Sequence, residues 1–304
     1  MSYGLQLALI FAMVILGCAK VTLQGQVSRR FLRNTSDSVL FNAELFVVIS
    51  VVMAILFPLG RIETVGILLA VLTACGTVIF QTTYTLALRI GPVSLTVLIA
   101  NLSSFITVIF SMIAYRESFY LTQLIGILFL VLSMLLGIKR TDDEKGINGK
   151  WLLLVLMMTI ANGVASVIMK VFSKEMSVQI ENSQNTFMVL CYLSAACLAV
   201  GLFCVTSRMG RRERASFGIF NKGVLIFVLA IGVVLGIYQK LHMIGLEKID
   251  SGFMLPTYSG LQSLGMTFIG ILMFGDKLST RQKIGIACGI ICVILMNVRI
   301  IQLF

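Results

Sequence analysis

The fold is decided by two stretches that align without gaps, IGPVSLTVLIANLSSFITVIFSMIAYRESFYLTQLIGI (Ile90–Ile127) and IDSGFMLPTYSGLQSLGMTFIGILMFGDKLSTRQKIGI (Ile249–Ile286). Characteristic residues in or beside them match in pairs: Arg89 with Lys248, Glu117 with Asp276, Gln123 with Gln282 and Gly126 with Gly285. Self-similarity at a fixed spacing indicates a repeated structural unit. The sequence therefore predicts a chain built from two related halves.

The composition is typical of a membrane protein. Of the 304 residues, 58% are hydrophobic and 12% are charged, whereas about a quarter of the residues in an ordinary soluble domain are charged. The apolar residues form continuous runs long enough for helices to cross the ~30 Å hydrocarbon core. They do not alternate with polar residues as in a membrane β-barrel. We therefore predict an all-α polytopic protein of the lipid bilayer, and we expect it in the cytoplasmic (plasma) membrane.

Ten apolar runs could span the membrane, at residues 3–23, 39–60, 64–88, 93–114, 119–139, 151–172, 185–207, 222–246, 251–274 and 281–303. The longest polar connection, KRTDDEKGINGK (Lys139–Lys150), separates five runs from five. We therefore predict a first five-helix repeat at 1–140, a polar linker at 141–150 and a second repeat at 151–304. Because five is odd, the second repeat is inverted in the membrane. Such inverted repeats are typical of secondary transporters, whose substrate site lies at the repeat interface.

The block from TYTLALRIGPVS through AYRESFYLTQLIGILFLVLSMLLG resembles the drug/metabolite transporter superfamily, EamA type. The resemblance extends along nearly the whole chain. The family has a Gly-Glu turn before its fifth span, where this chain has Arg116-Glu117, and often a lysine late in its first span, which Lys20 fits. It frequently has an arginine in span two and prolines in spans four and nine, where this chain has Asn42, Glu44, Ser104 and Ser263.

The resemblance implies a transporter, and most readily an exporter, of a small metabolite such as an amino acid or a drug-like solute, working by alternating access without a cofactor. It also implies cytoplasmic termini and homodimers through the fifth and tenth spans, to which Gly285-x-x-x-Gly289 is suited. The loop charges predict the opposite orientation, with the termini outside, because most basic residues lie on the other face. Both orientations stay open.

Two lysines occupy matching places late in the first and sixth runs, in VILGCAKVT (Val14–Thr22) and VASVIMKVF (Val164–Phe172). Only ~25 Å of helix precedes Lys20, so its side chain starts within the hydrocarbon. Lys20 and Lys170 could reach the headgroups with their ammonium groups. Alternatively, each faces a central cavity and binds an anionic group of the solute, because ionisable residues inside a membrane are candidate functional residues.

Polar and aromatic side chains gather in the third and eighth runs. Gln81 and Tyr84 share one helix face, as do Tyr238 and His242. Small-molecule sites combine aromatic walls with a few polar groups, so Gln81, Tyr84, Tyr238 and Lys240 are candidate binding residues. His242, the only histidine, could titrate near neutral pH and serve proton coupling, or it could be an interfacial residue.

The fourth, sixth and ninth runs supply the remaining binding candidates, Asn101, Asn162, Tyr258 and Gln262. In lipid these side chains need polar partners, so they should point into the bundle, toward solute or toward another helix. Glu44 is a second candidate for proton coupling. Its place about five residues into the second run also suits a carboxylate near a helix N-terminus.

Other functional classes are less favoured. The net charge of +11 comes with no nucleic-acid-binding motif, so we expect no nucleic-acid partner. One histidine excludes a two-histidine metal site, and no catalytic constellation is readable, so we expect neither a metal nor an enzyme. Without a GxxxxGK[ST] motif, direct use of ATP is disfavoured. The leading hypothesis is a secondary transporter; the alternatives are a non-transporting structural or regulatory membrane protein and, less favoured, a membrane-embedded enzyme.

Overall fold

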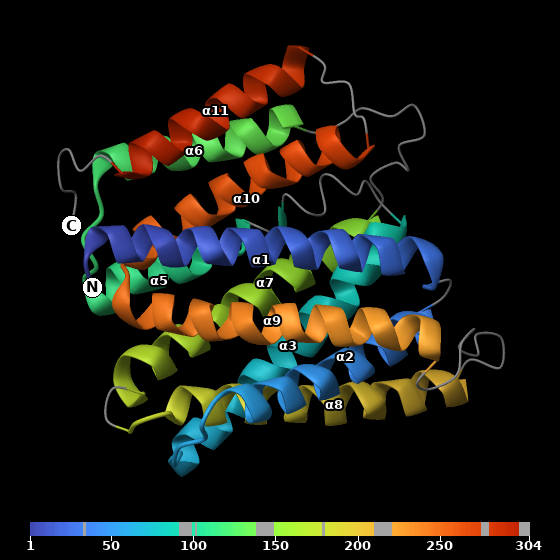
Figure 1. Cartoon of the computed structure of the whole chain (residues 1–304). Coiled ribbons are helices and arrows are strands. Elements are labelled where there is room, and N and C mark those ends of the chain that lie inside the picture. Colours follow the sequence, from blue (N-terminus) through green and yellow to red (C-terminus); the bar gives the residue numbers. More distant parts are fainter. Residues whose placement is uncertain are drawn as a thin grey trace.

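The computed structural model describes residues 1–32, 35–90, 99–100, 102–137, 149–177, 180–209, 221–274 and 280–297. These residues form ten α-helices and one π-helical segment, shown in Figure 1. They are α1 (Tyr3–Arg30), α2 (Thr35–Leu56), α3 (Thr64–Ile90), α5 (Ser104–Tyr115), α6 (Leu121–Gly137), α7 (Gly149–Val171), η1 (Phe172–Met176), α8 (Ser183–Met209), α9 (Lys222–Lys248), α10 (Ser251–Phe274) and α11 (Thr280–Asn297).

The prediction of an all-helical, polytopic membrane protein is confirmed. Within the described part of the chain, six helical segments are long and apolar enough to cross a membrane: α1, α2, α3, α7 continued by η1, α8 and α9. Large apolar side chains stand on their outer faces, for example Ile15 and Ile55, exposed by 68% and 76%. Apolar outer faces suit contact with lipid, and a helix satisfies its own backbone hydrogen bonds there.

Most helices run roughly along one direction of the bundle, so its two ends can be named. The Tyr3 end holds Tyr3, the α2–α3 connection, η1 and the α9–α10 connection (left in Figure 1). Contacts across this end include the rings of Tyr3 and Phe253, 6.3 Å apart, and the Asn185 amide, which donates to the Pro58 carbonyl over 2.7 Å. The other end, which holds Arg30, is called the Arg30 end.

The structure corrects two predicted boundaries. α1 continues past the predicted end at residue 23 to Arg30, because nothing in its polar last third breaks a helix; the Thr22 hydroxyl donates to the Cys18 carbonyl on the preceding turn over 2.9 Å. α2 spans Thr35–Leu56 instead of 39–60. It ends there because Pro58 disfavours helical backbone at the residue before it. Both corrections change how deep candidate site residues lie.

Helices from the two predicted halves pack against each other throughout. α2 packs on α8 and α6 on α11, while α3 lies against α7 and α1 against α9. Gly232 and Gly236 of α9 face Val48 and Val52 of α2, so this glycine pair lets the two helices approach closely.

Gly285 and Gly289 of α11 also pack against helices of the same chain. Gly289 lies against Ser133 of α6 and Leu264 of α10, and the Ser133 hydroxyl donates to the Gly285 carbonyl over 2.6 Å. The homodimer stays a prediction.

Candidate functional site

Lys20 lies near the middle of the bundle. α1 runs antiparallel to α9: Leu9 contacts Gly245 near one end of α9, and Phe31 contacts Gly223 near the other. Lys20 is midway between these two contacts along α1. A further ten residues, ~15 Å of helix, separate it from Arg30. The sequence placed Lys20 one side-chain length from the membrane edge; the longer α1 moves that edge away, which disfavours the headgroup-anchoring interpretation.

Gly17, one turn before Lys20 on the same face, lets α1 approach α10 closely. A Cβ atom added at Gly17 would lie 2.5 Å from the Tyr258 hydroxyl oxygen and 2.8 Å from the Gln262 amide nitrogen. The Tyr258 hydroxyl is hydrogen-bonded to both Gln262 and Tyr238. Polar groups of α10 therefore lie against the helix that carries Lys20.

α9 adds two rings to this arrangement. Tyr238 lies 5.8 Å from Tyr258, ring centroid to ring centroid, and 5.8 Å from His242, on which it stacks. The His242 Nδ1 atom is buried and has no hydrogen-bond partner among the described residues. Lys20 and Lys170 are both close enough to act on this imidazole electrostatically. We call Gly17, Lys20, Tyr238, His242, Tyr258 and Gln262 the Lys20 cluster.

Lys170, the counterpart of Lys20 in the sequence, has a different environment. Its side chain is fully buried and its Nζ lies 2.5 Å from Glu117 Oε1. The partly exposed Lys174 lies 3.8 Å from the same carboxylate oxygen. Lys170 stands at the end of α7, just before the π-helical segment η1. Its charge is thus compensated within the protein, near the Tyr3 end.

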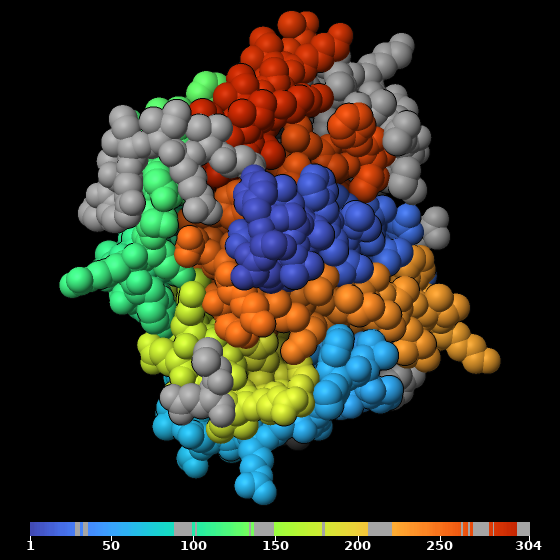
Figure 2. Space-filling model, turned by 60° about the vertical axis from the view of Figure 1, so that its left-hand side comes forward, coloured from blue at the N-terminus to red at the C-terminus, as the bar shows by residue number. Residues whose placement is uncertain are grey.

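Glu117 also holds the start of α10. Its second oxygen, Oε2, accepts a hydrogen bond from the Ser251 backbone N–H over 2.7 Å, a group that opens α10 and has no partner within its own helix. The Ser251 and Ser111 hydroxyls are 3.2 Å apart. Figure 2, turned toward the Tyr3 end, shows the start of α1 (blue) closely bordered by the α9–α10 region (orange).

The other predicted residues do not join the Lys20 cluster. Tyr84 stacks on Phe80 at 5.6 Å and packs on the buried group around Trp151. The backbone carbonyl of Gln81 accepts a hydrogen bond from the Thr85 hydroxyl on the next turn. α3 packs on α7 and α8, whereas α9 packs on α1 and α2, so the third and eighth spans do not form one polar cluster.

Asn162, Lys240 and Glu44 have separate surroundings. The Asn162 amide donates to the Ser103 hydroxyl over 2.6 Å, and the Lys240 Nζ lies 6.0 Å from the centre of the Phe57 ring. Glu44 is buried, and the earlier start of α2 makes it the tenth residue of that helix. Glu44 therefore does not lie near the helix N-terminus as the sequence indicated, and its role in proton coupling stays a prediction. Asn101 lies outside the described residues.

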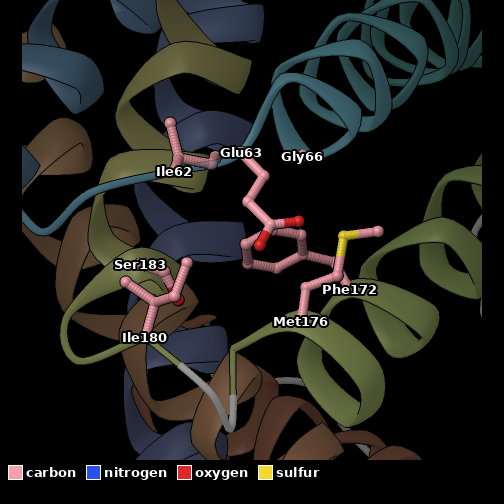
Figure 3. A pocket seen from close by; sticks show the side chains of 7 residues that line it. All are labelled: Ile62, Glu63, Gly66, Phe172, Met176, Ile180 and Ser183. Carbon is pink, nitrogen blue, oxygen red and sulfur yellow. The ribbon is translucent and has the colours of Figure 1, made fainter.

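Sequence reasoning missed three features. Glu117 was noted only as one member of a matched acidic pair; its part in holding Lys170 and Ser251 depends on the tertiary fold. The Gln239 amide donates to the Tyr192 hydroxyl between α9 and α8. The third is a small hollow of about 10 Å³ at the Tyr3 end, where the Glu63 side chain points toward the Phe172 ring (Figure 3).

The fold is similar to that of a known structure. One crystal structure, described only as that of a protein, is similar over 97% of this chain and 96% of its own, with a TM-score of 0.73 and 15% sequence identity. At that identity the likeness shows the fold alone. No curated protein sequence matches the chain.

A family model provides the link to function. The model of the EamA-like transporter family matches residues 7–138, which include nearly all of α1 and the whole of α2, α3, α5 and α6. This family is one of transporters, not of enzymes. The resemblance inferred from the sequence is thereby confirmed: residues 7–138 match the model of the EamA-like transporter family.

Proposed function

We propose that this protein is a secondary transporter that moves a small metabolite, amino-acid-like or drug-like, across the plasma membrane by alternating access, and that it works as an exporter. The observation that carries the proposal is the Lys20 cluster. It places a lysine, an amide, a histidine and two tyrosines in the middle of a membrane bundle. Ionisable residues at that depth are costly and mark solute or ion pathways.

Alternating access requires two halves that can move against each other, and the helix contacts support an inverted repeat. Exchanging the two predicted halves converts the α3–α7 contact into α9–α1, the α3–α8 contact into α9–α2, and the α5–α7 contact into α10–α1; both members of each pair are present. The α2–α8 and α6–α11 contacts convert into themselves. This is the pattern expected for two related units around a pseudo-two-fold axis, with the solute site between them.

The energy source follows from chemistry that the chain lacks and from the family it matches. The sequence contains no GxxxxGK[ST] phosphate-binding loop. We therefore propose that an ion gradient, exchange or the solute's own gradient drives transport. The resemblance to EamA-type proteins supports export.

Solute flux in proteoliposomes tests the proposal. The full chain is reconstituted, the vesicles are loaded with a mixture of amino acids, organic acids, amines and drug-like solutes, and efflux is followed by mass spectrometry. We expect gradient-dependent efflux of at least one solute above that of empty vesicles. Lys20→Met should lower this flux on the order of tenfold or more, because it removes the proposed charge partner of the solute.

Lys174→Met is the matched control, since Lys174 is also a lysine but is partly exposed near the Tyr3 end. Its flux should stay close to that of the wild type, and both variants should insert at normal levels. Wild-type vesicles that release no member of the panel faster than empty vesicles would contradict transport and favour a structural or regulatory role.

A further inference from the structure

We propose that the solute is a small organic anion with a flat, unsaturated body and no positive charge, bound with its anionic group at Lys20. This inference rests on the proposed transport function and adds the chemical class of the solute. It differs from the amino acids that the family resemblance suggests, because an amino acid carries an ammonium group as well as a carboxylate.

The two matched lysines differ in whether an acidic side chain compensates their charge. Glu117 compensates Lys170 at 2.5 Å. Among the described residues, Lys20 has no ion-pair partner. A positive charge inside a membrane bundle is unfavourable without a counter-ion. An anionic group on the solute removes that cost, so the Lys20 cluster favours an anion over its neutral analogue.

The three helices that form the cluster contain almost no acidic residues. α1 and α10 contain no Asp or Glu, and α9 contains only Glu247. Glu247 lies at the Tyr3 end, where its Oε2 accepts the Gln184 amide over 2.5 Å. An ammonium group on the solute would therefore meet Lys20 and find no counter-charge on these helices. Like charges repel, so cations and zwitterions are disfavoured.

Hydrogen-bond donors gather beside Lys20. The Gln262 amide and the Tyr258 hydroxyl lie beside Gly17, one turn from Lys20. Together with the lysine ammonium they supply several N–H and O–H donors, which a carboxylate can accept through two oxygens. The Nδ1 atom of His242, which has no hydrogen-bond partner in the described part of the chain, offers one further polar contact. Charge-assisted hydrogen bonds of this kind are stronger than neutral ones.

Aromatic rings in the cluster could contact the body of the solute. Tyr238 stands between two other rings, Tyr258 and His242, at 5.8 Å from each. Rings attract one another in offset-stacked or edge-to-face arrangements, beyond the gain from their buried area. A flat unsaturated body can replace one of these ring contacts when it enters. A saturated ring of similar size gains only the apolar burial.

A matched series of ligands with one carbon skeleton tests the class. 3-Phenylpropanoate is the anion, 3-phenylpropanamide the neutral analogue, phenylalanine the zwitterion and 3-phenylpropylamine the cation; 3-cyclohexylpropanoate is the saturated anion. Thermal unfolding of the detergent-purified full chain is followed against ligand concentration, because a bound ligand raises the melting temperature by mass action. We expect saturable stabilisation by 3-phenylpropanoate, with a Kd about tenfold or more below those of the amide, phenylalanine and the amine.

The saturated anion should bind several-fold more weakly than 3-phenylpropanoate. In Lys20→Met the advantage of the anion over the amide should fall to about twofold or less, whereas Lys20→Arg and the control Lys174→Met should keep it. Equal or better binding of the amine, phenylalanine or the amide by the wild type would overturn the proposal, and so would the absence of any stabilisation by 3-phenylpropanoate. The ranking on the wild type decides this even if a variant does not fold.

The two proposals fail in different ways. A preference for the anion without flux of any solute in proteoliposomes would leave the class of ligand standing and contradict transport. Flux of a cation or zwitterion in preference to the anion would support transport and contradict the class.

Discussion

Glu117 contacts Lys170 over 2.5 Å through one carboxylate oxygen and accepts the Ser251 backbone N–H over 2.7 Å through the other. One side chain from the connection between α5 and α6 thus ties the end of α7 to the start of α10. The relationship joins both predicted halves at the Tyr3 end. If that end opens during transport, we predict that the ion pair must separate.

The first prediction concerns the stability of this ion pair. Glu117→Gln leaves Lys170 fully buried without a counter-ion, and breaking a buried pair from one side costs about 3–5 kcal/mol. We therefore expect a clear fall in the melting temperature of the purified protein. Lys174→Met, which removes the partly exposed second lysine at 3.8 Å, should change stability by less than about 1 kcal/mol. The double variant Glu117→Gln/Lys170→Met should recover part of the loss; a melting temperature as low as that of Glu117→Gln alone would contradict the pairing.

The second prediction concerns the closed state of the Tyr3 end. Ser173 lies in η1 with its side chain fully buried, and its hydroxyl contacts Met243 of α9. In a Ser173→Cys protein, the thiol should react slowly with a polar maleimide, as judged by mass spectrometry of the labelled peptide. Adding Glu117→Gln should speed this labelling, because the open state is no longer opposed by the ion pair. An unchanged labelling rate would mean that Glu117 does not hold this end closed.

The third prediction concerns the contact between α1 and α10. Gly17→Val would place a side chain where the Tyr258 hydroxyl and the Gln262 amide now lie. We expect loss of ligand stabilisation and of flux by about tenfold or more, since the neighbouring groups are the proposed binding groups. Gly25→Val on the same helix is the control, because a Cβ atom there meets nothing within 4 Å. Equal effects of the two substitutions would contradict a site at Gly17.

The fourth prediction concerns His242. Its Nδ1 is buried and unpartnered among the described residues, and both Lys20 and Lys170 act on its ring. Protonation would add a positive charge close to two lysines, which opposes it, so we expect flux to change with pH mainly below about pH 6, on the acid side of the ordinary histidine range. The dependence should flatten in His242→Gln. An identical pH profile in that variant would remove His242 from the transport cycle.

The long apolar runs specified the helical membrane fold well, because length and continuous hydrophobicity are local properties. Boundaries set by polar residues were harder to predict: the polar last third of α1 remains helical, and Pro58 ends α2 earlier than its hydrophobicity indicates. These few residues changed the depth of Lys20 and of Glu44. A boundary error of one or two turns is small for a fold and large for a site.

The candidate site could be predicted only in part. Lys20, Tyr238, His242, Tyr258 and Gln262 were all identified as polar or aromatic residues inside apolar runs, and the structure brings them together. The sequence could not distinguish Lys20 from Lys170, because the difference lies in Glu117, far away in the chain. It also listed Tyr84 and Tyr238 together as candidate binding residues, although α3 packs mainly on α7 and α8 and α9 packs mainly on α1 and α2.

The central claim is that the Lys20 cluster opens alternately to both sides of the membrane. Cys18, a native, buried cysteine next to Gly17 whose thiol contacts the Gln262 carbonyl, reports on this directly. Right-side-out and inside-out vesicles are each treated with a membrane-impermeant methanethiosulfonate reagent, and modification of Cys18 is read by mass spectrometry. We predict that Cys18 is modified from both sides and that 3-phenylpropanoate slows the reaction in each case. Modification from only one side, or from neither, would contradict alternating access to this cluster.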